Sequence, residues 1–227
     1  SVDPTKRKNA EILSNFKKTH GLEKYKVYGL YNSPYHADVL IAYVLHYAVD
    51  KDGKKKTNHL LFRTDWANGT PDQVINSWYQ IRHPNNSWIG DVEIDGYNQH
   101  RIYLSYTKGK DNPASIFGDK GMVYALQYRT NSRHSLKREI DISKNVPNCM
   151  AGRYNLAYTK ENGGKLFIAT RNGVFLARGR ALKGKSRWQK VGENLPHCKI
   201  YGLDYNDEKE VLTVGLFGRG VWQYYLK

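Results

Sequence analysis

Carboxylate side chains are the residues of this chain whose type and spacing best suit catalysis. Asp91, Glu93 and Asp95 alternate along one short segment, and Asp204 stands in a related segment near the C-terminus. Hydrolysis of a glycosidic bond requires two carboxyl groups held a fixed distance apart. Asp91 with Asp204 is the best pair that the sequence offers. Asp204 replaces Tyr31 and Ala157 of the related segments, so a solvated carboxylate without a catalytic role is an equal interpretation.

Histidine is the next residue type that suggests chemistry. A polysaccharide lyase removes a proton beside a carboxylate, which requires a base and a cation and would suit a basic protein. Seven of the eight histidines are spread over strands and loops with no visible pairing, and none is assigned as a base: His36, His46, His59, His83, His100, His134 and His197. No Cys or His cluster has the spacing of metal ligands, so the sequence indicates neither a metal site nor a cofactor.

Short repeated strands position these residues. KVYGL at residues 26–30 recurs as KIYGL at residues 199–203, and looser copies begin at Ile89 and Arg153. A period of this size is typical of propellers, solenoids and arrays. Eighteen tyrosines and five tryptophans favour strands over helices. We expect Tyr28, Tyr201 and Trp222 to be buried sheet residues.

Alternation of apolar and polar residues, broken at Gly, Asn and Asp, predicts four strands in each of three units and three strands in the last. Residues 1–25 form an N-terminal arm, either a short helix or a closing strand, and residues 65–75 form a long loop. The expected units are residues 26–82, 88–143, 152–192 and 199–227. Their expected strands are 26–31, 38–48, 58–63 and 77–81; 89–95, 101–106, 121–128 and 136–142; 153–158, 165–170, 173–176 and 187–191; 199–205, 211–216 and 218–224.

This arrangement predicts an all-β protein, a β-propeller or partial propeller of about four blade-like antiparallel units. The last unit lacks a fourth strand and so exposes an apolar edge. Residues 1–25 could supply the missing strand, or another chain could complete the propeller. Cys149 and Cys198 occupy similar contexts in successive units, and the sequence does not decide whether a disulfide joins them.

The formal net charge of +15 on 227 residues should attract polyanions. The basic residues form tight clusters only at residues 6–8, 54–56 and 178–187, and such runs are usually solvated loops. We therefore expect an acidic polysaccharide or a protein as partner and disfavour specific nucleic-acid binding. No apolar run approaches the ~20 residues needed to cross a bilayer, so membrane insertion is not expected.

Three segments resemble the BNR or Asp-box propellers, which include sialidases, xyloglucanase-type hydrolases and sortilin-like receptor domains. They are LFIATRNGVF at 166–175, WQKVGENLP at 188–196 and GRGVW at 218–222, and the resemblance is clearest over residues 152–224. The Asp box of the family is degraded here, because residues 180–188 keep Gly184, Ser186 and Trp188 without the Asp. The resemblance implies a propeller fold and a secreted or cell-surface location.

A sialidase-type site would need three arginines that clamp a carboxylate. Arg153, Arg171 and Arg219 lie near strand ends and, with Lys199, are the candidate ligand-binding residues. Arg171 and Arg219 also flank Gly173 and Gly220, and we favour their interpretation as turn residues over a role in a binding site. The interpretation that we prefer is a non-catalytic binding scaffold for an acidic glycan or a protein. The alternative is a carbohydrate-active enzyme, a glycoside hydrolase or polysaccharide lyase, or the C-terminal part of one.

Overall fold

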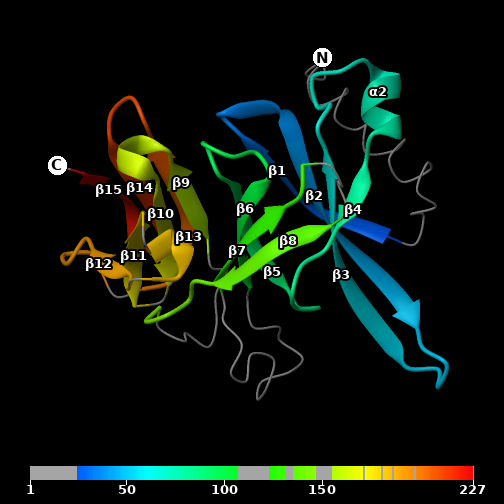
Figure 1. Cartoon of the computed structure of the whole chain (residues 1–227). Coiled ribbons are helices and arrows are strands. Elements are labelled where there is room, and N and C mark those ends of the chain that lie inside the picture. The colour runs from blue at the N-terminus through cyan, green and yellow to red at the C-terminus, as the bar shows by residue number, and fades with distance from the viewer. Residues whose placement is uncertain are drawn as a thin grey trace, which may run out of the picture. The chain divides into compact units, whose positions relative to one another are not determined.

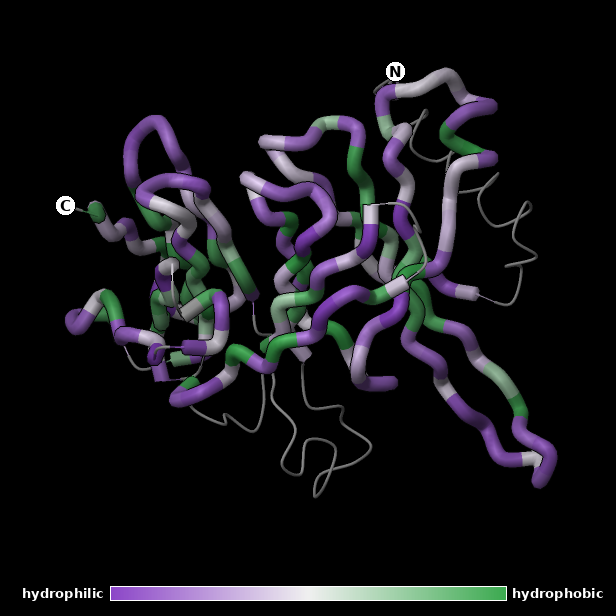
Figure 2. Tube along the Cα trace, in the orientation of Figure 1, coloured by the Kyte–Doolittle hydropathy of each residue, from purple (hydrophilic) through white to green (hydrophobic). Residues whose placement is uncertain are grey.

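The computed structural model describes residues 25–106, 123–130, 135–146, 155–170, 172–179, 181–185, 187–196 and 198–226. These residues form an all-β protein of the β-propeller or partial-propeller class, with four antiparallel sheets whose strands follow one another in chain order. Three sheets have four strands and the last has three, as the sequence predicts (Figure 1). In Figure 2 the apolar residues run along the strands, while the turns between them are hydrophilic.

The chain divides between Asn86 and Ser87 into two compact units. The first unit contains one sheet and a short helix, and the second contains the other three sheets. Arg129, Thr130 and residues 135–136 group with the first unit, and the remaining described residues after Asn86 group with the second.

The sheet of the first unit is built on two long central strands. Its strands are β1 (Tyr25–Ser33), β2 (His36–Val49), β3 (Lys55–Thr64) and β4 (Tyr79–Ile81). Residues Ile41 to Leu45 of β2 are fully buried, and Ala42, Val44, Phe62 and Trp78 pack into one cluster. Burial of these side chains supplies the main driving force for folding this sheet.

A short helix, α2 (Pro71–Asn76), lies in the segment that the sequence assigns to a loop. Thr70 caps it: the Thr70 side chain accepts a hydrogen bond from the Gln73 amide, and the Gln73 side chain accepts one from the Thr70 amide. This reciprocal capping box satisfies amides that would otherwise lack partners at the first turn. Pro71 fits the first helical turn, where it removes no helical hydrogen bond.

Beyond Tyr25, the first residue of β1, the hairpin of β2 and β3 continues as a two-stranded ribbon. Tyr25 pairs with His46, and from Tyr47 to Val49 the described part of β2 pairs with β3 alone. The turn at the tip is closed by Asp50, whose Oδ1 accepts hydrogen bonds from the amides of Asp52 and Lys54. In Figure 1 this ribbon extends well past the other strands of its sheet.

The second unit contains three sheets of similar build. The first has β5 (Ile89–Ile94), β6 (Arg101–Tyr106), β7 (Val123–Tyr128) and β8 (Leu136–Asp141). The second has β9 (Leu156–Thr159), β10 (Lys165–Thr170), β11 (Gly173–Arg178) and β12 (Gln189–Val191), with the 3₁₀ turns Glu161–Gly163 and Ala181–Lys183 in its connections. The third has β13 (Ile200–Asn206), β14 (Val211–Leu216) and β15 (Gly220–Tyr225).

Within this unit the first strands of the last two sheets, β9 and β13, each pack beside the preceding sheet. Tyr158 of β9 stacks on Tyr103 of β6 with ring centroids 5.4 Å apart, and Tyr205 of β13 stacks on Phe167 of β10 at the same distance. The core between the last two sheets includes Phe167, Leu176 and Val214. The aromatic residues of the first strands thus join successive sheets.

The expectation that Tyr28, Tyr201 and Trp222 are buried is wrong. Their exposed fractions are 38% for Tyr28, 55% for Tyr201 and 39% for Trp222. Trp222 lies on β15, and no described strand pairs with the outer edge of β15. Tyr201 lies at the start of β13, next to the exposed turn between β14 and β15. Tyr28 and Tyr201 hold matching positions on the first strands of the first and last sheets, so this repeated aromatic position is open to solvent in both copies.

Three remaining expectations concern the N-terminal arm, the cysteine pair and membrane insertion. The N-terminal arm, as far as residue 24, and Cys149 lie outside the described residues. Cys198 is a partly buried free thiol. None of the helices in the described ranges has the length and apolar character required to cross a bilayer.

Candidate functional site

Asp91, the first of the candidate catalytic carboxylates, is engaged in joining two sheets. Its Oδ1 accepts a hydrogen bond from the Val92 amide at 2.9 Å, and its Oδ2 accepts one from the Leu156 amide of β9, also at 2.9 Å. Asn155 makes an equivalent link at the next sheet, where its Nδ2 donates to the Tyr201 carbonyl at 2.6 Å. Asp91 therefore has a structural role that repeats along the chain.

Glu93, on β5, is a carboxylate whose surroundings raise its pKa. Burial raises its pKa well above the usual value, and the negative charges of Asp91 and Asp204 raise it further. The structure thus brings Asp91, Glu93 and Asp204 into one electrostatic group on β5 and β13. Asp204 itself is exposed, so the group combines an acid that favours its protonated form with a solvated carboxylate.

Asp95, also noted in the sequence, is a buried structural residue. Its Oδ2 accepts hydrogen bonds from the Tyr103 hydroxyl at 2.6 Å and from Arg101 at 3.3 Å, and its Oδ1 accepts one from the Tyr158 hydroxyl at 3.4 Å. Burial raises the pKa of both tyrosines, and the Asp95 charge raises each further. The tyrosines therefore stay protonated and donate, which satisfies the buried carboxylate.

The candidate ligand-binding residues divide into two groups. Arg153 and Arg171 lie outside the described residues. Lys199 and Arg219 lie at the same end of the last sheet, because the Phe217 amide donates to the Lys199 carbonyl at 2.8 Å and Arg219 follows in the same turn. The described part of the chain thus brings two of the four candidates together.

Two exposed aromatic rings accompany these basic residues. Tyr201 and Phe217 have ring centroids 5.5 Å apart with planes inclined at 51°, and Phe217 is 64% exposed. The Lys199 ammonium lies over the Tyr201 ring, 4.7 Å from its centroid. We call Lys199, Tyr201, Phe217 and Arg219 the Tyr201 surface. The sequence identified its basic members, whereas it assigned Tyr201 to the core.

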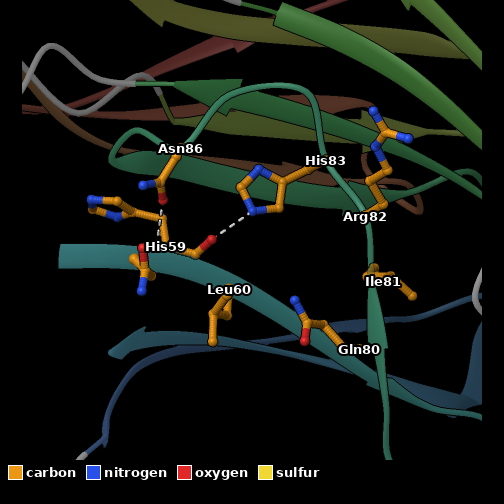
Figure 3. Close-up of a pocket in the computed structure, with 8 residues that line it drawn as sticks. His59, Leu60, Gln80, Ile81, Arg82, His83 and Asn86 are labelled. Carbon is orange, nitrogen blue, oxygen red and sulfur yellow. Dashed lines mark hydrogen bonds between the residues drawn. The ribbon is translucent and has the colours of Figure 1, made fainter. Parts of the chain in front are cut away.

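A pocket with a volume of about 490 Å³ lies in the first unit, at the outer edge of β3. Figure 3 shows its lining residues, which come from β3, β4 and the segment that follows β4. They are Asn58, His59, Leu60, Gln80, Ile81, Arg82, His83 and Asn86. The sequence names both histidines, but their pairing arises only when β3 and β4 come together.

Burial holds both histidines of this pocket in the neutral form at neutral pH. It lowers the pKa of His59 to about 4, with a further contribution from repulsion by His83. It also lowers the pKa of His83, against the raising effect of hydrogen bonds to the backbone of His59 and Asn85. The His59 Nδ1 is hydrogen-bonded to the buried Tyr43 hydroxyl at 2.5 Å.

No cluster of three or more His, Cys, Asp or Glu residues with the geometry of a metal site occurs among the described residues. Comparison with known proteins gives no assignment: no family model matches the chain, and no curated protein matches it significantly. Function is therefore inferred from the sites themselves.

Proposed function

We propose that this chain is a binding scaffold that holds an acidic polysaccharide on the Tyr201 surface. The observation that carries the proposal is the exposed Tyr201 and Phe217 pair with the Lys199 ammonium over Tyr201. Exposed aromatic side chains that gather on one surface mark sites of interaction. Aromatic faces pack against the C–H groups of sugar rings, and Lys199 and Arg219 supply positive charge for sulfate or carboxylate groups.

The composition of the chain supports the same partner. A net charge of +15 favours association with polyanions at long range, and this attraction weakens as salt screens it over a distance of about 8 Å at physiological ionic strength. The proposal carries with it a secreted or cell-surface location, where acidic polysaccharides are abundant. The resemblance to BNR or Asp-box propellers, which suggested such a location, remains part of this proposal.

Binding of heparin, measured by calorimetry over a series of salt concentrations, tests the proposal. We expect affinity to fall steeply with salt. We expect Tyr201→Ala to weaken binding roughly fivefold to tenfold, which corresponds to about 1 kcal/mol for a lost cation–π and stacking contact. Lys199→Gln and Arg219→Gln should also weaken binding.

Matched controls lie at the opposite end of the same sheet. Tyr225→Ala removes another exposed tyrosine, from the end of β15, and Lys209→Gln removes a charge from the turn between β13 and β14. Both should leave affinity nearly unchanged. Affinity that is independent of salt, or equal losses in the controls and the Tyr201 surface variants, would exclude this surface as the site.

The Glu93 group favours a second candidate, a carbohydrate-active enzyme. A carboxyl group that remains protonated beside a solvated carboxylate is the arrangement from which glycosidases obtain an acid and a base. Glu93 would be the acid and Asp204 the base, while Asp91 is engaged by two backbone amides. Release of oligosaccharides from acidic or neutral polysaccharides, abolished in Glu93→Gln, would establish this function. Binding without any product would support the scaffold.

A further inference from the structure

The pocket of the first unit forms where strand pairing between β3 and β4 stops. The last pair of this ladder is Leu61 with Ile81. In the same register Leu60 would next face Arg82, and His59 would then face His83. Instead, the chain turns away at Pro84, which has no amide hydrogen to donate to a ladder. The backbone edge of β3 at Thr57 and His59 is thereby left for side chains to occupy.

Side chains of the segment after β4 take the place of a strand at this edge. The His83 Nε2 donates to the His59 carbonyl at 2.7 Å. The His59 amide donates to the Asn86 Oδ1 at 2.7 Å, and the Asn86 Nδ2 donates to the Thr57 carbonyl at 3.3 Å. Figure 3 shows His83 and Asn86 directed toward β3 by these contacts. The wall of the pocket is therefore fixed before a ligand enters, which lowers the cost of binding.

The lining has a clear electrostatic character. It contains no carboxylate, and Arg82 is its one permanently charged residue. Asn58 and Gln80 contribute amides, and Leu60 and Ile81 contribute apolar surface. The groups facing the two imidazoles are Tyr43 of β2, the other imidazole and the backbone carbonyls of His59 and Asn85. Such a cavity offers side-chain amides, apolar surface and the positive charge of Arg82 to a small ligand.

We propose that this pocket binds a compact ligand bearing an oxyanion group, such as a sulfate, with Arg82 as the residue that recognises the anion. Its volume of about 490 Å³ lies within the range of small-ligand sites, which suits a single sulfated sugar or a free sulfate. An anion near the two imidazoles would favour their protonated forms, so binding should tighten as the pH falls. The pocket and the Tyr201 surface have no residue in common, so the two proposals are tested independently.

Calorimetric titration with inorganic sulfate and with glucose 6-sulfate, at pH 5.5 and pH 7.5, tests this inference. We expect both probes to bind more tightly at pH 5.5, with the sugar sulfate tighter than free sulfate if the apolar and amide groups contact the ring. Equal affinity of the two probes would assign the pocket to the anion alone. Arg82→Gln should weaken binding about tenfold or more, because it removes a charge-assisted hydrogen bond.

Two matched variants act as controls. Arg129→Gln removes an exposed guanidinium of the same unit that does not line the pocket, and His36→Gln removes a histidine at the start of β2. Both should bind like the parent chain, whereas His83→Gln should lose the tightening at pH 5.5. Circular dichroism at both pH values confirms that each variant is folded. The inference is overturned if neither probe binds at either pH, or if Arg82→Gln and Arg129→Gln bind alike.

Discussion

At the scale of single residues, His59 links the pocket to the pH dependence of folding. Its pKa is about 4 in the folded chain, compared with the ordinary histidine value of 6.5. Below pH 6.5 His59 becomes protonated in the unfolded chain but stays neutral in the folded chain, so the free energy of unfolding falls as the pH decreases toward 4. The loss amounts to at most about 3 kcal/mol at pH 4 relative to pH 7.

We therefore predict that His59→Gln reduces the slope of unfolding free energy against pH between pH 4 and pH 6.5. Urea denaturation at several pH values in this range measures the slope. His36→Gln serves as the control and should keep the parent slope. An unchanged slope in His59→Gln would show that His59 ionises normally in the folded chain.

Glu93 has the opposite effect on the pH dependence of stability. Burial and the neighbouring Asp91 and Asp204 raise its pKa, so the folded chain holds this proton more tightly than the unfolded chain. Ionisation of Glu93 therefore costs stability as the pH rises above the ordinary glutamate value.

We expect Glu93→Gln to raise the urea midpoint at pH 7.5, because glutamine removes the ionisation that favours the unfolded chain. The midpoint should change much less at pH 4, where the carboxyl is largely protonated in both states. Glu208→Gln, in the exposed turn after β13, is the control and should behave alike at both pH values. A stability gain that is equal at both pH values would point to packing rather than charge as its cause.

At the scale of elements, the strands were predictable because their signal is local. Alternating residues and glycine or asparagine turns predicted every strand of the described sheets to within a few residues. The helix α2 was missed, although Thr70, Pro71 and Gln73 form a capping signal that the sequence contains. Its single apolar turn is too short for a periodic pattern, and the signal lies entirely in its cap.

Trp188 and Trp222 show that local sequence does not reveal whether a tryptophan is buried. Trp188 is 3% exposed, and its Nε1 donates to the Ile142 carbonyl at 2.6 Å, which ties the third sheet of the chain to the second. Trp222 is 39% exposed, and its Nε1 donates to the Arg219 carbonyl of the adjacent turn at 3.1 Å. Neighbouring sheets, rather than residue type, decide this difference.

We predict that Trp188→Ala destabilises the chain by about 3–5 kcal/mol, because it leaves a cavity and an unpaired carbonyl. Trp222→Ala is the matched variant and should cost roughly 1 kcal/mol, because surface substitutions away from buried networks have small effects. Denaturant unfolding of both variants measures the contrast. Equal costs would mean that Trp222 is covered in solution.

At the scale of the whole molecule, the sequence predicts the class of fold but not the contacts between sheets. The Tyr158 hydroxyl reaches Asp95 across 63 residues, and the Leu156 amide reaches Asp91 across 65. Such pairs have no sequence pattern, because each partner belongs to a separate sheet with its own local signal. For the same reason Asp91 resembled a catalytic residue in the sequence, and the pairing of His59 with His83 was not visible. The ligand-binding roles of Arg153 and Arg171 remain predictions.

The last sheet ends in β15, whose outer edge is unpaired among the described residues. Leu226 donates to the Glu210 carbonyl, so the alternation of an antiparallel ladder directs the amides of Val221, Gln223 and Tyr225 toward the free edge. An exposed edge with Val221 and Tyr225 largely open to solvent is prone to pair with another strand. The N-terminal arm or another chain would supply that strand.

We predict that such pairing occurs in solution and that Gln223→Pro disrupts it, because proline removes an outward amide without removing a bond to β14. The melting temperature should fall by several degrees, at roughly 2–4 °C per kcal/mol lost for a chain of this size. If another chain supplies the strand, the solution mass measured by light scattering should fall as well. Gln223→Lys changes the same side chain but keeps the amide, and it should retain the parent melting temperature and mass. A proline variant identical to the lysine variant in both measurements would show that the edge of β15 is free.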